Sequence, residues 1–490
     1  MNIREYVVTN KRERTVGTVL WVSIVLLVVI FFAISMPAQL SHTIDLTIIL
    51  SFVSNGMLFI YGIVISQKRY PFSISFMLWT FSFIFMFYAP LIQYINNVYP
   101  WNYQISDKVL IQTNNIVSVF SLITMVTYEI IYYLKTKDDR LVLRTDDLKK
   151  SDTYINNLPI SEKKLACISY CMLFYIILFV IRLKPSDFLS KYKVEKVWSI
   201  AGISSLTTLF STVSMYLVTC VFLFNIIMFV KNKKIKLSQI ISLIAFVLVL
   251  FPLSTTRFVL ATTYLGIVVV LIQKKKLSVY VAPVFFISFL LIFRFLGAMS
   301  HLSINGGGFF DIIKDVYINF NESYFSGDYD AYSNLAKAVE YIAENGTTNG
   351  RQLLGCLLFF IPRTIWKTKP IGSGALIAEA LGNDFTNISM PLIGEGLLNF
   401  GYFGVATYAI IIAVVISSMD IYYWNTPIAE LYICVKSEKP KSIFRLYFNL
   451  IYPFILFLSF FCFRGDFLSS FTHLSTLVAT SIFTYLFVTK

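Results

Sequence analysis

Two arginines lie at positions that suggest chemistry inside a membrane. Arg257 follows an apolar stretch in the run Ser254-Thr-Thr-Arg257, and Arg294 lies within another apolar stretch. A central membrane arginine costs roughly 2.5–3.5 kcal/mol on insertion scales, so it normally faces a polar cavity or a partner. Guanidinium groups bind phosphate through paired hydrogen bonds. Arg257 therefore indicates recognition of a phosphate or diphosphate, and Arg294 indicates either the same role or extension toward lipid headgroups.

A long polar segment, 298–395, carries the next candidates. Within it, Leu353 to Ile361 is nearly all apolar, is too short to cross a bilayer and is stopped by Pro362. This pattern predicts an interfacial or re-entrant helix. Its C-terminal flank would bring Arg363 and Lys369 close to the membrane surface.

Carboxylates accompany these cations. Asp328 and Asp330 lie in Ser326-Gly-Asp-Tyr-Asp-Ala-Tyr332, and Glu395 lies in Gly394-Glu-Gly-Leu-Leu-Asn-Phe-Gly401. Cationic phosphate ligands beside a candidate base would suit transfer of a sugar from a lipid diphosphate to a hydroxyl group. We expect Glu395 to be the base or to orient the acceptor. The six cysteines have no CxxC or His-rich spacing, so no metal site is expected.

The elements that position these residues are predicted to be transmembrane helices. Hydrophobic residues make up 57% of the 490 residues and charged residues only 14%, which is too apolar for a soluble core of this length. A membrane helix needs about 20 apolar residues. The fold class is therefore all-α, a polytopic membrane protein with about twelve spans. The predicted spans are 16–36, 46–66, 72–93, 109–134, 165–181, 200–230, 238–254, 258–273, 278–298, 396–419, 446–463 and 467–487.

Charge sets the expected orientation. Twelve spans with a cytoplasmic N-terminus place most basic residues on the cytoplasmic side, in agreement with the positive-inside rule. The protein is then a multi-pass protein of the cytoplasmic membrane, with both termini cytoplasmic and an active face that is periplasmic or extracellular. Its parts are helices one to nine (1–297), a large outer loop (298–395) and helices ten to twelve (396–490). The net charge of +14 reflects topology and not nucleic-acid binding.

One outer loop departs from this charge pattern. Basic residues cluster between the predicted fifth and sixth spans, with only Asp187 and Glu195 beside them: Arg182, Lys184, Lys191, Lys193 and Lys196. Contact with lipid phosphates explains this cluster, and so does binding of a lipid-linked substrate.

The chain resembles the Wzy-type polymerases that join O-antigen and capsule repeat units in bacteria. The resemblance covers the topology of the whole chain, and its most specific residues lie in and after the large loop. Arg363 and Gly374 have the Arg-x10-Gly spacing of some members. The other matching stretches are Gly350-Arg-Gln-Leu-Leu, Phe360-Ile-Pro-Arg363, Trp366, Lys369-Pro370, Gly372 to Gly374, and Pro391 to Gly404.

The resemblance implies an enzyme that acts on undecaprenyl-diphosphate-linked oligosaccharides. The growing chain would be the donor and the new repeat unit the acceptor. No nucleotide sugar, cofactor or metal would take part. Membrane lipid and a chain-length regulator protein would be the other partners. Glu395, Arg363 and Arg257 would be catalytic. Substrate binding would involve Arg294, Lys369, Arg351, Asp328 and Asp330.

Other classes remain open at this point. A lipid-glycan flippase would also hold cations in a cavity, although transporters usually show inverted repeats, and none is apparent here. An O-antigen ligase shares the general architecture, but the ligases are thought to use an outer-loop histidine, and His42, His301 and His473 lie in no recognisable motif. A mannosyltransferase of the polyisoprenyl-phosphate type would need an acidic pair in the first outer loop, which has only Asp45.

Overall fold

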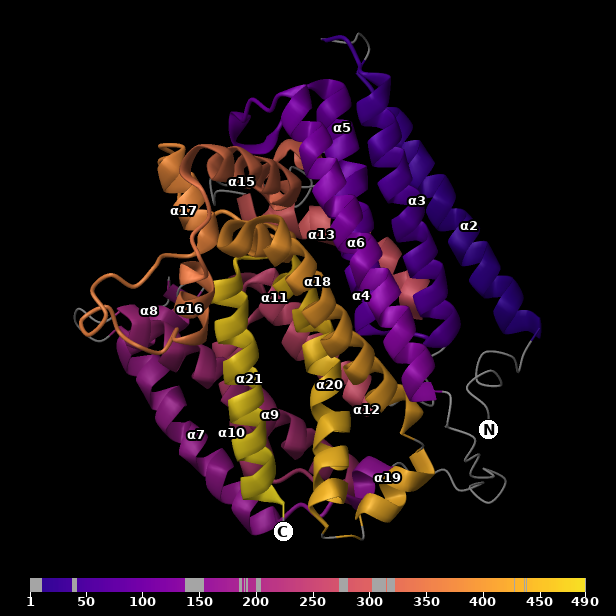
Figure 1. Ribbon diagram of the computed structural model, residues 1–490. Coiled ribbons are helices and arrows are strands. Elements are labelled where there is room, and N and C mark those ends of the chain that lie inside the picture. Colours follow the sequence, from indigo (N-terminus) through magenta and orange to yellow (C-terminus); the bar gives the residue numbers. More distant parts are fainter. Residues whose placement is uncertain are drawn as a thin grey trace.

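The structure, a computed structural model, is a bundle of helices (Figure 1). It describes residues 11–37, 42–136, 154–184, 187–188, 190, 193–199, 204–272, 281–301, 314, 322–426, 428–435, 437 and 439–489. Over these residues it contains helices and turns, and a single bridge pairs Ile160 with Thr489. The predicted all-helical class is confirmed.

The long helices coincide with the predicted spans. Within the part of the chain that the structure describes, eight helical segments are long and apolar enough to cross a membrane: Leu46–Arg69 (α3), Ile74–Asn96 (α4, η1 and α5), Asp107–Thr136 (α6), Glu162–Arg182 (α7), Leu206–Asn232 (in α9, Ser204–Asn232), Leu392–Asn425 (α18), Pro440–Arg464 (α20) and Phe467–Val488 (α21). Shorter apolar stretches match the other four predicted spans: Val19–Ile34 in α2 (Lys11–Ile34), α10 (Leu237–Val249), Arg257–Ile272 (α11, η7 and α12), and Val281–Leu291 in α13 (Val281–His301). The count of twelve crossings stays a prediction.

The outward-facing side chains of these helices are apolar. Val29 is 58% exposed, Ile181 74% and Phe403 75%, on three separate helices. A soluble protein rarely exposes apolar surface of this extent, whereas helices in lipid satisfy their backbone polar groups internally and present apolar side chains outward. The protein is therefore membrane-embedded.

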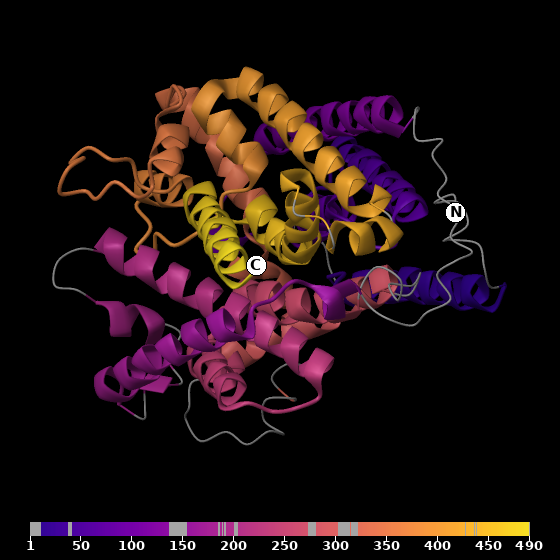
Figure 2. The ribbon, with the colours of Figure 1, turned by 90° about the horizontal axis from the view of Figure 1, so that it is seen from below.

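Two apolar cores meet at helix α20. The first core lies among α3 to α6, α13 and α18, and the second among α7, α9, α10, α12 and α21. Helix α20 contributes Tyr452 and Leu456 to the first core and Leu450 and Phe454 to the second. Figure 2 shows α20 and α21 between the two groups of helices. Side chains at the ends of α20 can therefore contact residues of both cores.

A buried carboxylate fixes the start of α4 (Ile74–Phe83). Asp420 of α18 accepts hydrogen bonds from the backbone N–H groups of Ile74 and Ser75, both at 3.0 Å. It also accepts a 2.6 Å bond from the Tyr452 hydroxyl. The positive end of a helix dipole stabilises such a carboxylate, and the contact ties α4, α18 and α20 together.

The described part of the segment between α13 and α18 contains three short α-helices: α15 (Ala331–Asn345), α16 (Arg351–Leu357) and α17 (Ser373–Ala380). We call the end of the bundle at which they lie the loop end; the C-terminus lies at the opposite end (Figure 1). The short helix expected before Pro362 is present as α16, but it ends at Leu357. Whether α16 contacts the membrane stays a prediction.

Helix α18 is broken near its start. Phe400 and Gly401 have non-helical backbone angles, and Gly401 has a φ of 64°, which favours glycine. The break separates the helical turns before Phe400 from the long span that follows it. Gly396 and Gly404 approach so closely across the break that a Cβ on either would overlap the other's backbone. The glycine-rich motif predicted to be functional therefore shapes this bend.

Candidate functional site

A segment at the loop end, residues 322–332, is fastened to the first core. The Gln93 side chain of α5 (Ala89–Asn96) donates hydrogen bonds to the carbonyl oxygens of Tyr324 (2.8 Å) and Tyr329 (3.1 Å). The Tyr332 hydroxyl donates a 2.9 Å bond to Asn114 of α6. These buried bonds hold the backbone that carries Asp328 and Asp330, which we call the Asp328 segment (Ser326 to Asp330).

Arg257 meets this segment directly. It begins α11 (Arg257–Leu260), after the turn that contains Pro252. Its two terminal nitrogens donate hydrogen bonds to the two carboxylate oxygens of Asp328, at 3.0 and 2.8 Å. The two side chains are 25% and 24% exposed. The bidentate geometry, which a phosphate can also adopt, joins residues 71 positions apart in the sequence and links the second core to the Asp328 segment.

Arg464 holds the same segment from the end of α20. Its Nη2 donates to the Gly327 carbonyl at 2.9 Å and to Asp330 Oδ1 at 3.2 Å, and its Nε donates to the Asp328 carbonyl at 3.2 Å. The guanidinium carbon also lies 5.7 Å from the centre of the Phe85 ring. Arg257 and Arg464 therefore bring two cations, from two different helices, to one short acidic segment.

The two aspartates of this segment differ sharply in burial. Asp330 is 1% exposed, and besides Arg464 it accepts hydrogen bonds from Ser389 Oγ and from Trp101 Nε1 (3.1 Å). A buried carboxylate with this many donors is a structural anchor. Asp328, by contrast, is partly exposed, and Arg257 is its ion-pair partner.

Glu395 lies in a second carboxylate group. The loop was expected to continue to Glu395, but α18 begins at Leu392, and Glu395 is fully buried in its first turn. One carboxylate oxygen accepts a 2.7 Å bond from Ser373 Oγ, and the other accepts a 3.0 Å bond from the Phe467 N–H. With both oxygens bonded inside the protein, Glu395 connects α17, α18 and α21.

Asp466 lies close to Glu395 and fastens the same turn. It accepts hydrogen bonds from the Gly374 N–H and the Leu468 N–H, both at 2.9 Å, and so caps α21. Burial raises the pKa of its carboxyl group above the ordinary value. A Cβ at Gly374 would overlap the Ile388 carbonyl. Gly374, the glycine of the Arg-x10-Gly spacing, is thus required by close packing and by its bond to Asp466.

The structure also brings together two motif stretches separated in sequence. The carbonyl oxygen of Asn399, freed by the break in α18, accepts a 3.1 Å hydrogen bond from the Gly350 N–H, and Asn399 Oδ1 accepts a 3.0 Å bond from the Leu353 N–H. Gly350 has a φ of +79°, and a Cβ there would meet the Phe400 ring. The start of α16 is therefore fixed to the bend in α18.

Arg363, Lys369 and Arg351 bind the backbone of their own loop. Arg363 donates to the carbonyl oxygens of Lys369 (2.6 Å) and Pro370 (3.1 Å). Lys369 donates to those of Phe359 (2.6 Å) and Ile361 (3.0 Å), and Arg351 donates to that of Thr368 (2.8 Å). Burial, with the nearby Arg363 charge, lowers the pKa of Lys369. These three residues shape residues 357–370, and none is joined to Arg257 or Asp328 by a bond that the structure describes.

Arg294 belongs to helix α13, but its side chain lies outside the described residues. Its expected part in substrate binding therefore stays a prediction.

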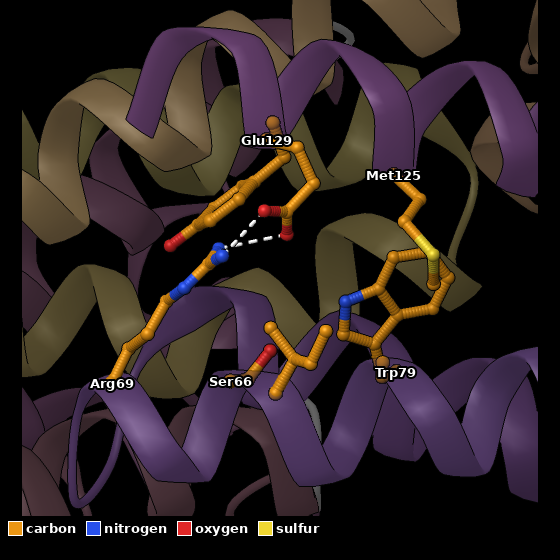
Figure 3. Close-up of a pocket in the computed structure, with 8 residues that line it drawn as sticks. Ser66, Arg69, Trp79, Met125 and Glu129 are labelled. Atoms are coloured by element: carbon orange, nitrogen blue, oxygen red, sulfur yellow. Dashed lines mark hydrogen bonds and ion pairs between the residues drawn. The ribbon is translucent and has the colours of Figure 1, made fainter. Parts of the chain in front are cut away.

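A pocket lies among α3, α4 and α6 (Figure 3). Its lining includes Arg69, Glu129, Trp79 and Met125. Arg69 forms a paired salt bridge with Glu129, with one bond of 2.8 Å, and its guanidinium carbon lies 3.9 Å from the centre of the Tyr132 ring. The charge of Arg69 is neutralised by Glu129, so we interpret this pocket as part of the packing contact between α3 and α6.

Arg464 and Asp466 are not among the site residues predicted from the sequence. Arg464 and Asp466 form the run Arg464-Gly-Asp466, which looks like a chance tripeptide. The signal that could have found them is the position of charged residues in the short connection between two apolar spans.

Comparison of the chain with protein families, with curated proteins and with solved structures gives no match.

Proposed function

We propose that this protein is a glycosyltransferase that joins undecaprenyl-diphosphate-linked oligosaccharide repeat units into O-antigen, capsule or exopolysaccharide chains. The reaction would take place at the loop end, on the outer face of the cytoplasmic membrane. The bond between the donor sugar and its lipid diphosphate breaks, a bond from the sugar to the acceptor oxygen forms, and the proton of that hydroxyl is taken up by the released lipid diphosphate.

The observation that carries this proposal is the arrangement of Arg257 and Arg464 around the Asp328 segment. Leaving-group charge on a diphosphate is stabilised by preorganised cationic donors in a site of low dielectric. Arg257 presents a planar fork that is partly exposed, and its present partner, Asp328, has the geometry of an anionic ligand. In this proposal Arg257 binds the diphosphate. Asp328 is the carboxylate that the diphosphate displaces from Arg257.

The other predicted residues take supporting parts in this proposal. Glu395 is fully buried with both oxygens bonded, so we propose that it positions the 372–374 turn instead of removing the acceptor proton. In this proposal Arg363 and Lys369 hold the conformation of their loop. Arg363 is exposed and can also contact the donor at the edge of the site.

Deletion of the gene tests the proposal. A polymerase acts after the repeat unit has crossed the membrane, so we expect loss of long chains while single repeat units still reach the outer face on lipid or on the final acceptor. Chain length by gel electrophoresis and the sidedness of the lipid-linked units are the measurements. Undiminished long chains would rule out a polymerase, and units held on the cytoplasmic side would indicate a flippase.

A further inference from the structure

A buried lysine contacts the turn that presents Arg257. Lys193 begins α8 (Lys193–Trp198), between α7 and α9, and is 1% exposed. Its Nζ donates a 2.6 Å hydrogen bond to Ser254 Oγ and lies 5.6 Å from the centre of the Phe251 ring. Ser254, itself 2% exposed, precedes Arg257 by three residues. Lys193 and Arg257 therefore belong to one small region at the loop end.

Lys193 differs from the other buried lysines in its partners. Lys337 pairs with Glu340 at 2.7 Å and also donates to the Gln104 carbonyl, and Lys369 donates to two carbonyl oxygens. For Lys193, by contrast, the described part of the chain supplies a neutral hydroxyl and an aromatic face, and no ion pair. An ammonium group has three donors, so this one has capacity for an anion.

The energetics point the same way. Burying an ammonium group is costly unless a counter-charge accompanies it, and a cation–π contact offsets only part of that cost. Burial lowers the pKa of Lys193 to about 8. A bound anion would supply the missing counter-charge.

We propose that Lys193 and Arg257 are two cations of one anion-binding site and that its ligand is the phosphate portion of a polyprenyl diphosphate. The identity of this ligand rests on the proposed function; the existence of an anion site rests on the burial and partners of Lys193. Lys193 binds from α8 while Arg257 binds from α11, so the site is formed by two elements, and each of them also places valine side chains in the second core.

Binding of farnesyl diphosphate to the purified full chain in phosphatidylcholine nanodiscs tests this proposal. Charge-assisted hydrogen bonds justify an expected loss of roughly ten- to a hundredfold in affinity for Lys193→Met. Lys193→Arg should retain part of the affinity. The control is Lys196→Met on the same helix, because Lys196 is 52% exposed and pairs with Asp187 at 2.7 Å, and it should bind like the wild type.

Several outcomes would overturn the proposal. Wild-type affinity in a monodisperse Lys193→Met protein would do so, as would a wild type that binds no farnesyl diphosphate. If Lys193→Met does not fold, Lys193→Arg with its charge in place must bind more tightly than Lys193→Gln, or the assignment fails. The anion could come from a lipid headgroup or from the polyprenyl diphosphate, and retention of phosphatidylglycerol, measured by mass spectrometry in mixed nanodiscs, distinguishes the two. If Lys193→Met loses this lipid but binds farnesyl diphosphate as the wild type does, the site binds a headgroup and the proposal is wrong. Normal polymer in the deletion strain would reject the polymerase and leave Lys193-dependent binding intact.

Discussion

Replacing Arg257 with alanine should remove long polysaccharide chains while leaving the protein in the membrane. Loss of one preorganised charge donor commonly costs about 2.7–4 kcal/mol in the transition state, which corresponds to a roughly hundred- to thousandfold slower reaction. Arg257→Lys should restore only part of the activity, because lysine keeps the charge but lacks the planar fork that holds Asp328 now. Chain length and protein abundance should be measured together.

Asp328→Asn is the matched variant for this experiment. It removes the charge that occupies Arg257 and leaves a side chain of the same size, so donor binding should be retained or strengthened. Normal chain length from Arg257→Ala at normal abundance would mean that Arg257 is only a structural partner of Asp328.

Replacing Asp330 with alanine should instead destabilise the protein. Removing one member of a buried ion pair typically costs about 3–5 kcal/mol, since the remaining charge loses its partner. Here the change removes the carboxylate that accepts hydrogen bonds from Arg464, Ser389 and Trp101. We expect lower abundance in the membrane and a lower melting temperature in detergent.

The partly exposed Asp328 is the control for this effect, because Asp328→Ala lies on the same segment but should change the melting temperature much less. Equal melting temperatures for the Asp328 and Asp330 variants would contradict the view that Asp330 anchors the segment.

Much of the fold follows from local sequence, while the site depends on pairings that local sequence does not contain. Apolar runs long enough to cross lipid are readable one at a time, and their positions agree with the helices. The position of Arg257 at the end of a hairpin was predictable for the same reason. Its partner was not, because Asp328 lies 71 residues away and could have faced water, substrate or another cation.

Glu395 shows the limit of reading motifs from residue type. A glutamate among glycines in a polar loop resembles a catalytic base, but the short helix before the break at Phe400 buries it against Ser373 and the start of α21. Lys193 is the converse case. In the sequence it is one of five basic residues in a loop, and only the packing of α8 distinguishes it from exposed neighbours such as Lys196.

The most direct test of the central claim is polymerisation by the purified protein. Undecaprenyl-diphosphate-linked repeat units from the host should be incubated with the full chain in nanodiscs, and the products should be separated by length. We predict a ladder of lengthening glycans with release of one lipid diphosphate for each bond formed, and no ladder with Arg257→Ala. Repeat units that stay single with a folded wild-type protein, in nanodiscs where the same preparation binds the donor, would contradict the claim.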